Sequence, residues 1–303
     1  MIEAALYEHL QGQASLSPYL ALYAGKPAIF NQEAPSDMDT LWGDGPQYGR
    51  IVFAEDIEGD PERTMGGTLA VDIMCKEGQQ TPEEIEPLLR QAIHGYFFSN
   101  GKFTVAAQFK NSSYFTQPTD KVIGCTLTFD LLGFPLMTTC DPDVIDRLNA
   151  WTNEKFPHLH VINHEPLPKT AWKPEGQESA VYWRLISDQQ AGWIPDTYQT
   201  IWRTANVRGH IFSETRVTAG AAARAIITQL YTDKRLFKDG ESPIMVNRSN
   251  SLDPGADPLR TGQLTIEATY AIIVYFANGT PLEHINLEQR PIERGDDTGE
   301  DGT

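Results

Sequence analysis

Two related stretches, about 130 residues apart, constrain the fold of this chain more than any other feature of the sequence. The first reads AIFNQEAPSDMDTLW (residues 28–42) and the second reads VINHEPLPKTAW (residues 161–172). Each has a short apolar run, an Asn-x-Glu sequence, a bend that contains proline, and one tryptophan. The matching pairs are Asn31 and Asn163, Glu33 and Glu165, and Trp42 and Trp172.

The spacing of these pairs is nearly constant, which indicates a tandem repeat rather than a chance match. The asparagine and glutamate pairs are separated by 132 residues, from 31 to 163 and from 33 to 165. The tryptophan pair is separated by 130 residues, from 42 to 172. Because loops tolerate a difference of two residues and strands do not, the segment before each tryptophan is predicted to be a loop.

The flanking elements repeat in the same order. Apolar residues at helical spacing predict helices near both starts, over 2–10 and 143–156, and Thr81 and Thr218 are predicted to open one further helix each. Alternating apolar residues predict strands between them. The sequence therefore predicts an α+β fold: two tandem copies of a mainly antiparallel sheet with helices packed on one face, each in the order α-β-β-β-α-β-β. The expected strands are 28–33, 50–57, 67–75, 102–109, 121–134, 161–165, 180–187, 197–204, 206–212, 243–248 and 262–276.

The length of 303 residues fits two domains. We expect the first domain over residues 1–137 and a diverged second copy over 138–282. Residues 188–196 are expected to be an insertion in the second copy. The last segment, 283–303, is acidic and poor in aromatic residues, which predicts a disordered tail or one that a partner orders.

Composition excludes several classes of function. The formal net charge is -17, and both halves of the chain are acidic, so no basic face is expected to grip nucleic-acid phosphates. Three cysteines without a CxxC spacing support neither a disulfide framework nor a zinc site and fit an intracellular origin. No apolar run approaches the roughly 20 residues of a membrane span, and the N-terminus does not resemble a signal peptide. We therefore expect no membrane association.

The residues that could carry chemistry have simpler structural explanations. The sequence contains no Walker loop, GxGxxG, GxSxG or HExxH motif. Glu33 and Glu165 suggest a paired-carboxylate site, but an Asn-x-Glu sequence at a strand end more often bonds loop backbone. The HxHxxxH cluster suggests a metal site that would need further ligands. We therefore expect no enzyme, no catalytic residue, no cofactor and no metal; the cluster comprises His158, His160 and His164.

The aromatic residues offer two further hypotheses. Trp42 and Trp172 are predicted to be lids over the core of each unit or anchors at a subunit contact. Aromatic residues around the insertion would line a pocket if the chain were a ligand-binding module, although strands are rich in such residues in any case. This second group comprises Trp183, Trp193, Tyr198 and Trp202.

The first 135 residues resemble the tail terminator, or tail completion, proteins of long-tailed bacteriophages. The stretches that carry the resemblance are MIEAALYEHLQGQ, LALYAGKPAIFNQEAP, YGRIVFAEDIEGDPERTMGGTLAVDIMC, TPEEIEPLLRQAIHGYF and IGCTLTFDLLGF. The resemblance implies an α+β subunit of a ring, usually six-fold, that caps the head-proximal end of the tail tube and joins it to the neck. Such a ring ends tube assembly and lets DNA pass.

The resemblance implies a virion location after synthesis in the bacterial cytoplasm, with the tail tube protein, a neck or head-completion protein and other copies of the chain as partners. The second unit departs from the family pattern. Six chains would give a two-tier ring of twelve units, and three chains would give a pseudo-six-fold ring. Acidity fits a channel through which DNA slides without adhesion. Substitution of Trp42 or Trp172 is then expected to impair ring assembly before folding. The alternatives are another tail component, such as a tube or hub subunit, or a ligand-binding module.

Overall fold

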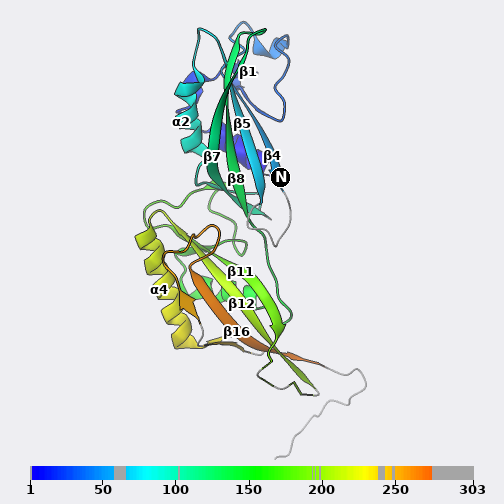
Figure 1. Cartoon of the computed structure of the whole chain (residues 1–303), viewed down its shortest axis with the longest axis vertical. Helices are drawn as coiled ribbons and strands as arrows, with labels where there is room; N and C mark the ends of the chain where they lie inside the picture. The colour runs from blue at the N-terminus through cyan, green and yellow to red at the C-terminus, as the bar shows by residue number, and fades with distance from the viewer. Residues whose placement is uncertain are drawn as a thin grey trace, which may run out of the picture.

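The chain folds into two α+β units that lie end to end along its long axis (Figure 1). The computed structural model describes residues 2–57, 66–101, 103–192, 194, 196–197, 199–237, 243–247 and 250–274. Within these residues each unit has one curled sheet and two long helices, so the predicted fold class is confirmed. The predicted acidic tail, 283–303, lies outside the described residues.

The first unit begins with helix α1, and its main sheet has seven strands, as does that of the second unit among the described residues. Helix α2 begins with a capping box, in which the Thr81 backbone N–H donates to Glu84 Oε2 at 3.4 Å. Its elements are α1 (Glu3–Gln11), β1 (Leu22–Tyr23), β2 (Lys26–Pro27), β3 (Ile29–Asn31), a short 3-10 helix (Thr40–Trp42), β4 (Arg50–Ile57), β5 (Gly67–Lys76), α2 (Pro82–Ile93), β6 (Phe97–Ser99), β7 (Thr104–Gln117) and β8 (Val122–Phe134).

The second unit repeats this order after a connector of nine residues, 135–143. The Asp143 carboxylate accepts from the Ile145 backbone N–H at 2.9 Å and so caps its first helix. Its elements are α3 (Val144–Lys155), β9 (Leu159–Val161), β10 (Ala171–Trp172), β11 (Ser179–Gln190), β12 (Thr200–Ser213), α4 (Arg216–Asp233), β13 (Arg235–Leu236), β14 (Ile244–Val246), β15 (Ser251–Leu252) and β16 (Leu264–Ile273).

The two sheets share one topology. The first has the order β10-β6-β7-β8-β5-β4-β3 and the second has the order β13-β14-β16-β12-β11-β9. In both, the edge strand (β3 or β9) pairs in parallel with its neighbour, and the neighbouring pairs that follow are antiparallel. Strands β3, β4, β5, β8, β7 and β6 therefore correspond to β9, β11, β12, β16, β14 and β13. Among the described residues each sheet has one further strand: β10 of the second unit joins the first sheet beside β6, and β15 pairs with β16 in the second.

The strand register agrees with the spacing of the sequence repeat. Ile29 pairs with Ile51 in the first unit, and Val161 pairs with Val181 in the second. The step from 29 to 161 is 132 residues, and the step from 51 to 181 is 130. These are the spacings of the asparagine and tryptophan pairs, so the two-residue difference lies in the loop between the strands, where the sequence predicted it.

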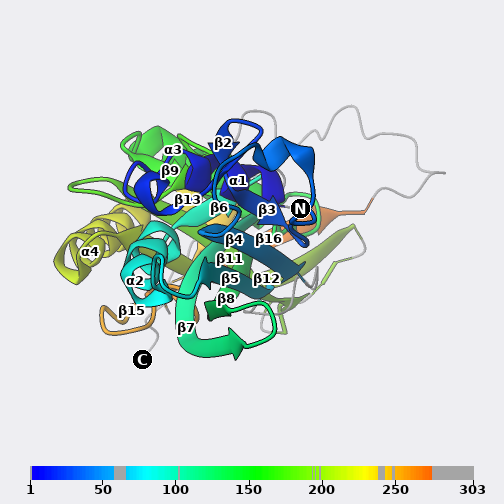
Figure 2. The same cartoon turned by 90° about the horizontal axis from the view of Figure 1, so that it is seen from above.

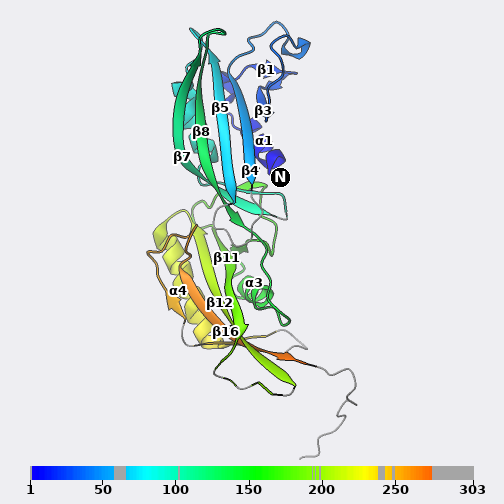
Figure 3. The same cartoon turned by 45° about the vertical axis from the view of Figure 1, so that its right-hand side comes forward.

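Each sheet has both of its long helices on one face. The first core joins side chains of α1 and α2 to the inner face of β4, β5 and β8, and the second joins α3 and α4 to β11, β12 and β16. Seen along the long axis, α1 and α3 lie toward one side of the molecule, and α2 and α4 lie toward another (Figure 2). Figure 3 shows α3 and α4 beside the second sheet.

Some element boundaries differ from the sequence expectations. The helical spacing of apolar residues after Thr81 continues to Phe97 and predicts a helix to that point. Helix α2 instead ends at Ile93, and Phe97 begins β6, because aromatic residues favour a strand after the turn at Gly95. The fourth helix begins at Arg216, two residues before Thr218, because Thr215 is the cap and its Oγ1 accepts from the Thr218 N–H at 3.1 Å. The expected insertion is partly a strand: β11 continues to Gln190.

Candidate assembly surface

The loop of the second unit that contains Trp172 contacts the sheet of the first unit. Strand β10 pairs antiparallel with β6, placing Ala171 opposite Phe98 and Trp172 opposite Phe97. The Ser99 backbone N–H donates to the Thr170 carbonyl at 2.9 Å. The edge of the first sheet is thus covered by a strand from the other unit. Such strand addition is a common way for proteins to bind one another.

An aromatic cluster lies at this junction. Phe97 contacts the rings of Trp172 at 5.6 Å and Phe212 at 4.9 Å between centroids, and Phe134 lies 5.2 Å from Tyr182. All five side chains are buried. Buried aromatic side chains contribute a large share of the free energy of association at protein interfaces. The two units therefore share a hydrophobic contact, separate from their own cores, that fixes β10 on β6.

Polar groups at the junction are paired across the two units. The Asn163 side-chain amide donates to the Phe134 carbonyl at 2.6 Å, and the Tyr182 hydroxyl donates to the Pro135 carbonyl at 2.7 Å. Burial raises the pKa of Tyr182, so its hydroxyl stays protonated and keeps donating. Lys173 Nζ donates to the His94 carbonyl at 3.2 Å. The junction is thus held by directional bonds as well as by apolar contact.

His210 lies in the same cluster and is 1% exposed. Burial lowers its pKa to about 4, so the ring is neutral at neutral pH. Its Nδ1 lies 2.7 Å from the Pro258 carbonyl, which a neutral ring protonated at Nδ1 satisfies. Nε2 has no hydrogen-bond partner among the described residues. The junction therefore contains a histidine whose protonation would place a charge in an apolar cluster.

Trp42 and Trp172 occupy equivalent positions. Trp42 is 3% exposed and packs against Tyr23 and Phe30, with ring centroids at 5.0 and 5.8 Å. Trp172 is 4% exposed and packs against His160 at 5.6 Å. Each indole covers the face of its first strand that points away from the core of its own unit. Neither indole lies over the core of its own unit: Trp42 packs in a separate small cluster, and Trp172 packs in the cluster between the two units.

This burial changes one expectation. Substitution of either tryptophan was expected to impair ring assembly before folding. A buried indole leaves little surface for another chain, and its removal opens a cavity. We therefore expect folding of the chain to be affected first. The segment around Trp172 does contact the first unit, through its backbone pairing with β6 and through the Trp172 ring, which packs on Phe97.

The other residues singled out in the sequence are not brought together. Glu33 is exposed in the first unit, whereas Glu165 accepts a hydrogen bond from Asn153 in the second. Two of the three clustered histidines, His158 and His164, are exposed, and His160 packs on Trp172. In the part of the chain that the structure describes, no group of three or more His, Cys, Asp or Glu side chains could hold a metal ion.

The aromatic residues near the insertion do not line one pocket. Trp183 is buried in the second core, where its Nε1 donates to Thr152 Oγ1 at 3.0 Å. Trp202 precedes Arg203 in β12, and Arg203 lies on the same face as the core residues Ala205 and Val207, so Trp202 points to the opposite face of the sheet. Trp193 and Tyr198 lie outside the described residues. A pocket at the junction, of about 260 Å³, is lined by both units and is smaller than most small-molecule sites.

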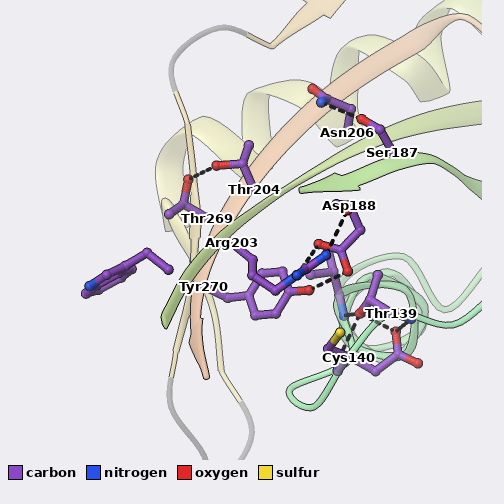
Figure 4. A network of polar contacts seen from close by, with 12 residues as sticks. Thr139, Cys140, Ser187, Asp188, Arg203, Thr204, Asn206, Thr269 and Tyr270 are labelled. Carbon is purple, nitrogen blue, oxygen red and sulfur yellow. Dashed lines mark hydrogen bonds and ion pairs between the residues drawn. The ribbon is translucent and has the colours of Figure 1, made fainter. Parts of the chain in front are cut away.

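A polar network joins strands of the second sheet close to the connector between the units (Figure 4). Asp188 accepts from Arg203 Nε at 2.9 Å and from the Tyr270 hydroxyl at 2.8 Å. Burial, followed by the bond to Asp188, raises the pKa of Tyr270. Thr139 and Cys140 of the connector lie beside these groups in Figure 4. The bonds of Asp188 join three adjacent strands, β11, β12 and β16.

Sequence reasoning did not find the junction. Its principal residues are Phe97, Phe134, Trp172, Tyr182, His210 and Phe212. One signal was present: residues 180–183 read AVYW, and all four side chains are buried. A continuous apolar run in a strand indicates burial of both faces. One face of β11 packs on its own helices and the other packs on the first unit.

Comparison with models of protein families gives no match, and comparison with curated proteins gives none either. No helix in the described part of the chain is long and apolar enough to cross a membrane.

Proposed function

We propose that this chain is a structural protein of a bacteriophage tail. It forms a ring at the head-proximal end, terminates the tail tube and connects it to the neck while DNA passes. The observation that carries the proposal is the junction: one copy of the α+β unit adds a strand to the sheet edge of the next copy. A unit that associates with its own kind through such a contact is suited to building a ring.

Three further observations support this function. The first unit has the α+β architecture that its resemblance to tail terminator proteins implies. The formal charge of -17 opposes adhesion of DNA phosphates to a channel wall. The conspicuous polar groups of the second unit do not converge on one open site: Asp188 and Tyr270 bond each other between strands, and His210 bonds the Pro258 carbonyl. We therefore propose a role without catalysis, metal or cofactor.

The proposed partners are other copies of the chain, the tail tube protein and a neck or head-completion protein, in the virion. Negative-stain images of the purified protein, alone and mixed with polymerised tail tubes, test the proposal. Rings alone, and rings seated on one end of each tube, are the expected result. Persistent monomers that never cap a tube would overturn it. Self-polymerisation into tubes would instead favour a tube subunit.

A further inference from the structure

The junction within one chain covers the edge of β6, but the equivalent edge strand of the second unit has no strand beside it among the described residues. Strand β13 of the second unit corresponds to β6, because each follows the second helix of its unit and pairs with the next strand. β6 is covered by β10, whereas β13 is the terminal strand of its sheet among the described residues. By the same correspondence, the segment in the first unit that matches β10 is Leu41–Trp42.

We infer that residues 38–44 of one chain bind the open edge of β13 in a second copy, repeating the β10–β6 contact between chains. This inference rests on the proposed function, since a ring of this chain needs one such contact per copy. The proposed contact has a donor surface on one chain and an acceptor surface on the other. The donor is the loop around Leu41 in the first unit, and the acceptor is the edge formed by Lys234, Arg235 and Phe237 in the second.

Both surfaces carry exposed apolar side chains. Met38 is 92% exposed and Leu41 is 54% exposed on the donor loop. Phe237, directly after β13, is 69% exposed. Within the chain, the corresponding positions at the junction are covered: Ala171 and Ser99 are buried. The donor loop and the acceptor edge therefore expose side chains at positions whose equivalents are buried in the junction within the chain.

Charge is complementary between the two surfaces. The donor loop carries Asp39 and Asp44, with Glu33 beside it, whereas Lys234 and Arg235 are exposed on the acceptor edge. In a chain with a formal charge of -17, two adjacent cations at a sheet edge stand out. They would attract the acidic loop of another copy and disfavour pairing of one β13 edge with another.

The donor segment differs from β10 in conformation. Thr40–Trp42 is one turn of 3-10 helix, held by bonds from Trp42 N to Asp39 O at 3.3 Å and from Gly43 N to Thr40 O at 3.1 Å. Leu41 makes two further bonds: its N–H donates to Asp39 Oδ1 at 2.9 Å, and its carbonyl accepts from the Ala24 N–H at 3.0 Å. A single 3-10 turn has weak internal bonding, and pairing with β13 would exchange these bonds for bonds to the second chain. We infer that it extends when it pairs with β13, as Ala171–Trp172 is extended on β6, while the indole of Trp42 stays on Phe30.

The inference also selects a stoichiometry. If the contact between chains repeats the contact within a chain, all units lie in one continuous series. A six-fold ring then contains six units, which three chains supply. A two-tier ring would instead place the first and second units of each chain in different rings.

Cysteine crosslinking tests the pairing directly. Extension of the β10–β6 register places Thr40 of one chain opposite Phe237 of the next, as Thr170 is opposite Ser99. In a Cys140→Ser background, a mixture of T40C chains and F237C chains should form a disulfide-linked dimer on mild oxidation. The matched control replaces F237C by V217C, a residue that is 79% exposed on α4. Its yield should be at least about tenfold lower, because Val217 is outside the contact.

A charge substitution gives the second readout. Phe237→Asp should raise the dissociation constant of the oligomer at least about tenfold, as loss of a central apolar contact does. Val217→Asp should leave the dissociation constant unchanged. Equal crosslinking of both cysteine pairs, an unchanged oligomer in Phe237→Asp, or a strictly monomeric parent protein would overturn the inference. An oligomer that passes both tests but never caps a tail tube would overturn the proposed function and leave the contact standing.

Discussion

The two units share a topology but differ in what covers their edges. In the first unit, β6 is covered by β10 from the second, and the aromatic cluster at the junction is buried. In the second unit, the equivalent strand β13 is terminal, and its neighbour Phe237 is exposed. The loops differ in the same way, since the one with Trp172 is paired and the one with Trp42 is not. The chain thus forms the β10–β6 contact within itself, and it leaves the equivalent two surfaces, the β13 edge and the loop with Trp42, unpaired in the described structure.

The largest expected effect is loss of either buried tryptophan. Trp172→Ala and Trp42→Ala should each lower the free energy of unfolding by about 3–5 kcal/mol, because each removes a buried indole. Only Trp172→Ala also loosens the junction. Thermal denaturation should therefore show one transition for Trp42→Ala and two for Trp172→Ala. Two transitions in both variants would mean that the loops do not differ as described.

The next effect is a pH dependence from His210. Its folded pKa of about 4 lies below the ordinary value of 6.5, so the unfolded chain takes up a proton that the folded chain cannot. The free energy of unfolding should fall between pH 6.5 and 4, by on the order of 3 kcal/mol from this residue. Burial lowers the pKa of His9 and His94 in the same direction. The contribution of His210 is therefore the difference in pH slope between the parent and His210→Gln. Equal slopes would contradict the buried position of His210.

Helix caps should give a smaller effect that is equal in the two units. Thr81 and Thr215 begin α2 and α4, and Thr215 Oγ1 accepts from the Thr218 N–H. Thr81→Ala and Thr215→Ala should each cost about 1 kcal/mol in chemical denaturation. Thr232→Ala, at the exposed end of α4, is the control and should cost less. If one of the two substitutions lowered the free energy of unfolding several times more than the other, α2 and α4 would not be equivalent helices.

The smallest effect on folding is expected at the open surfaces. Met38→Ser and Leu41→Ser change exposed side chains and should alter the free energy of unfolding of the monomer by less than about 0.5 kcal/mol. The same substitutions should weaken the oligomer, measured by sedimentation at several concentrations. A monomer destabilised as much as by the loss of Trp42 would show that this loop belongs to the core.

Sequence reasoning recovered the repeat because strand alternation, helix caps and the Asn-x-Glu and tryptophan spacing all depend on local pattern. It placed β5, β8 and α3 closely, since each has a regular apolar face and a clear boundary such as Asp143. The junction depends on which strands, distant in the sequence, lie beside each other. The periodicity of apolar residues within one strand or helix does not contain that information. Phe97 was assigned to a helix because its spacing continues that of Leu89 and Ile93; the turn at Gly95 decides otherwise.

The mass of the assembled oligomer tests the central claim most directly. Native mass spectrometry of the parent protein should show three chains, about 101 kDa from three chains of 33.8 kDa. Phe237→Asp should shift the population to single chains. A parent protein that remains a single chain, or a stable assembly of six chains, would contradict a ring in which one contact recurs within and between chains.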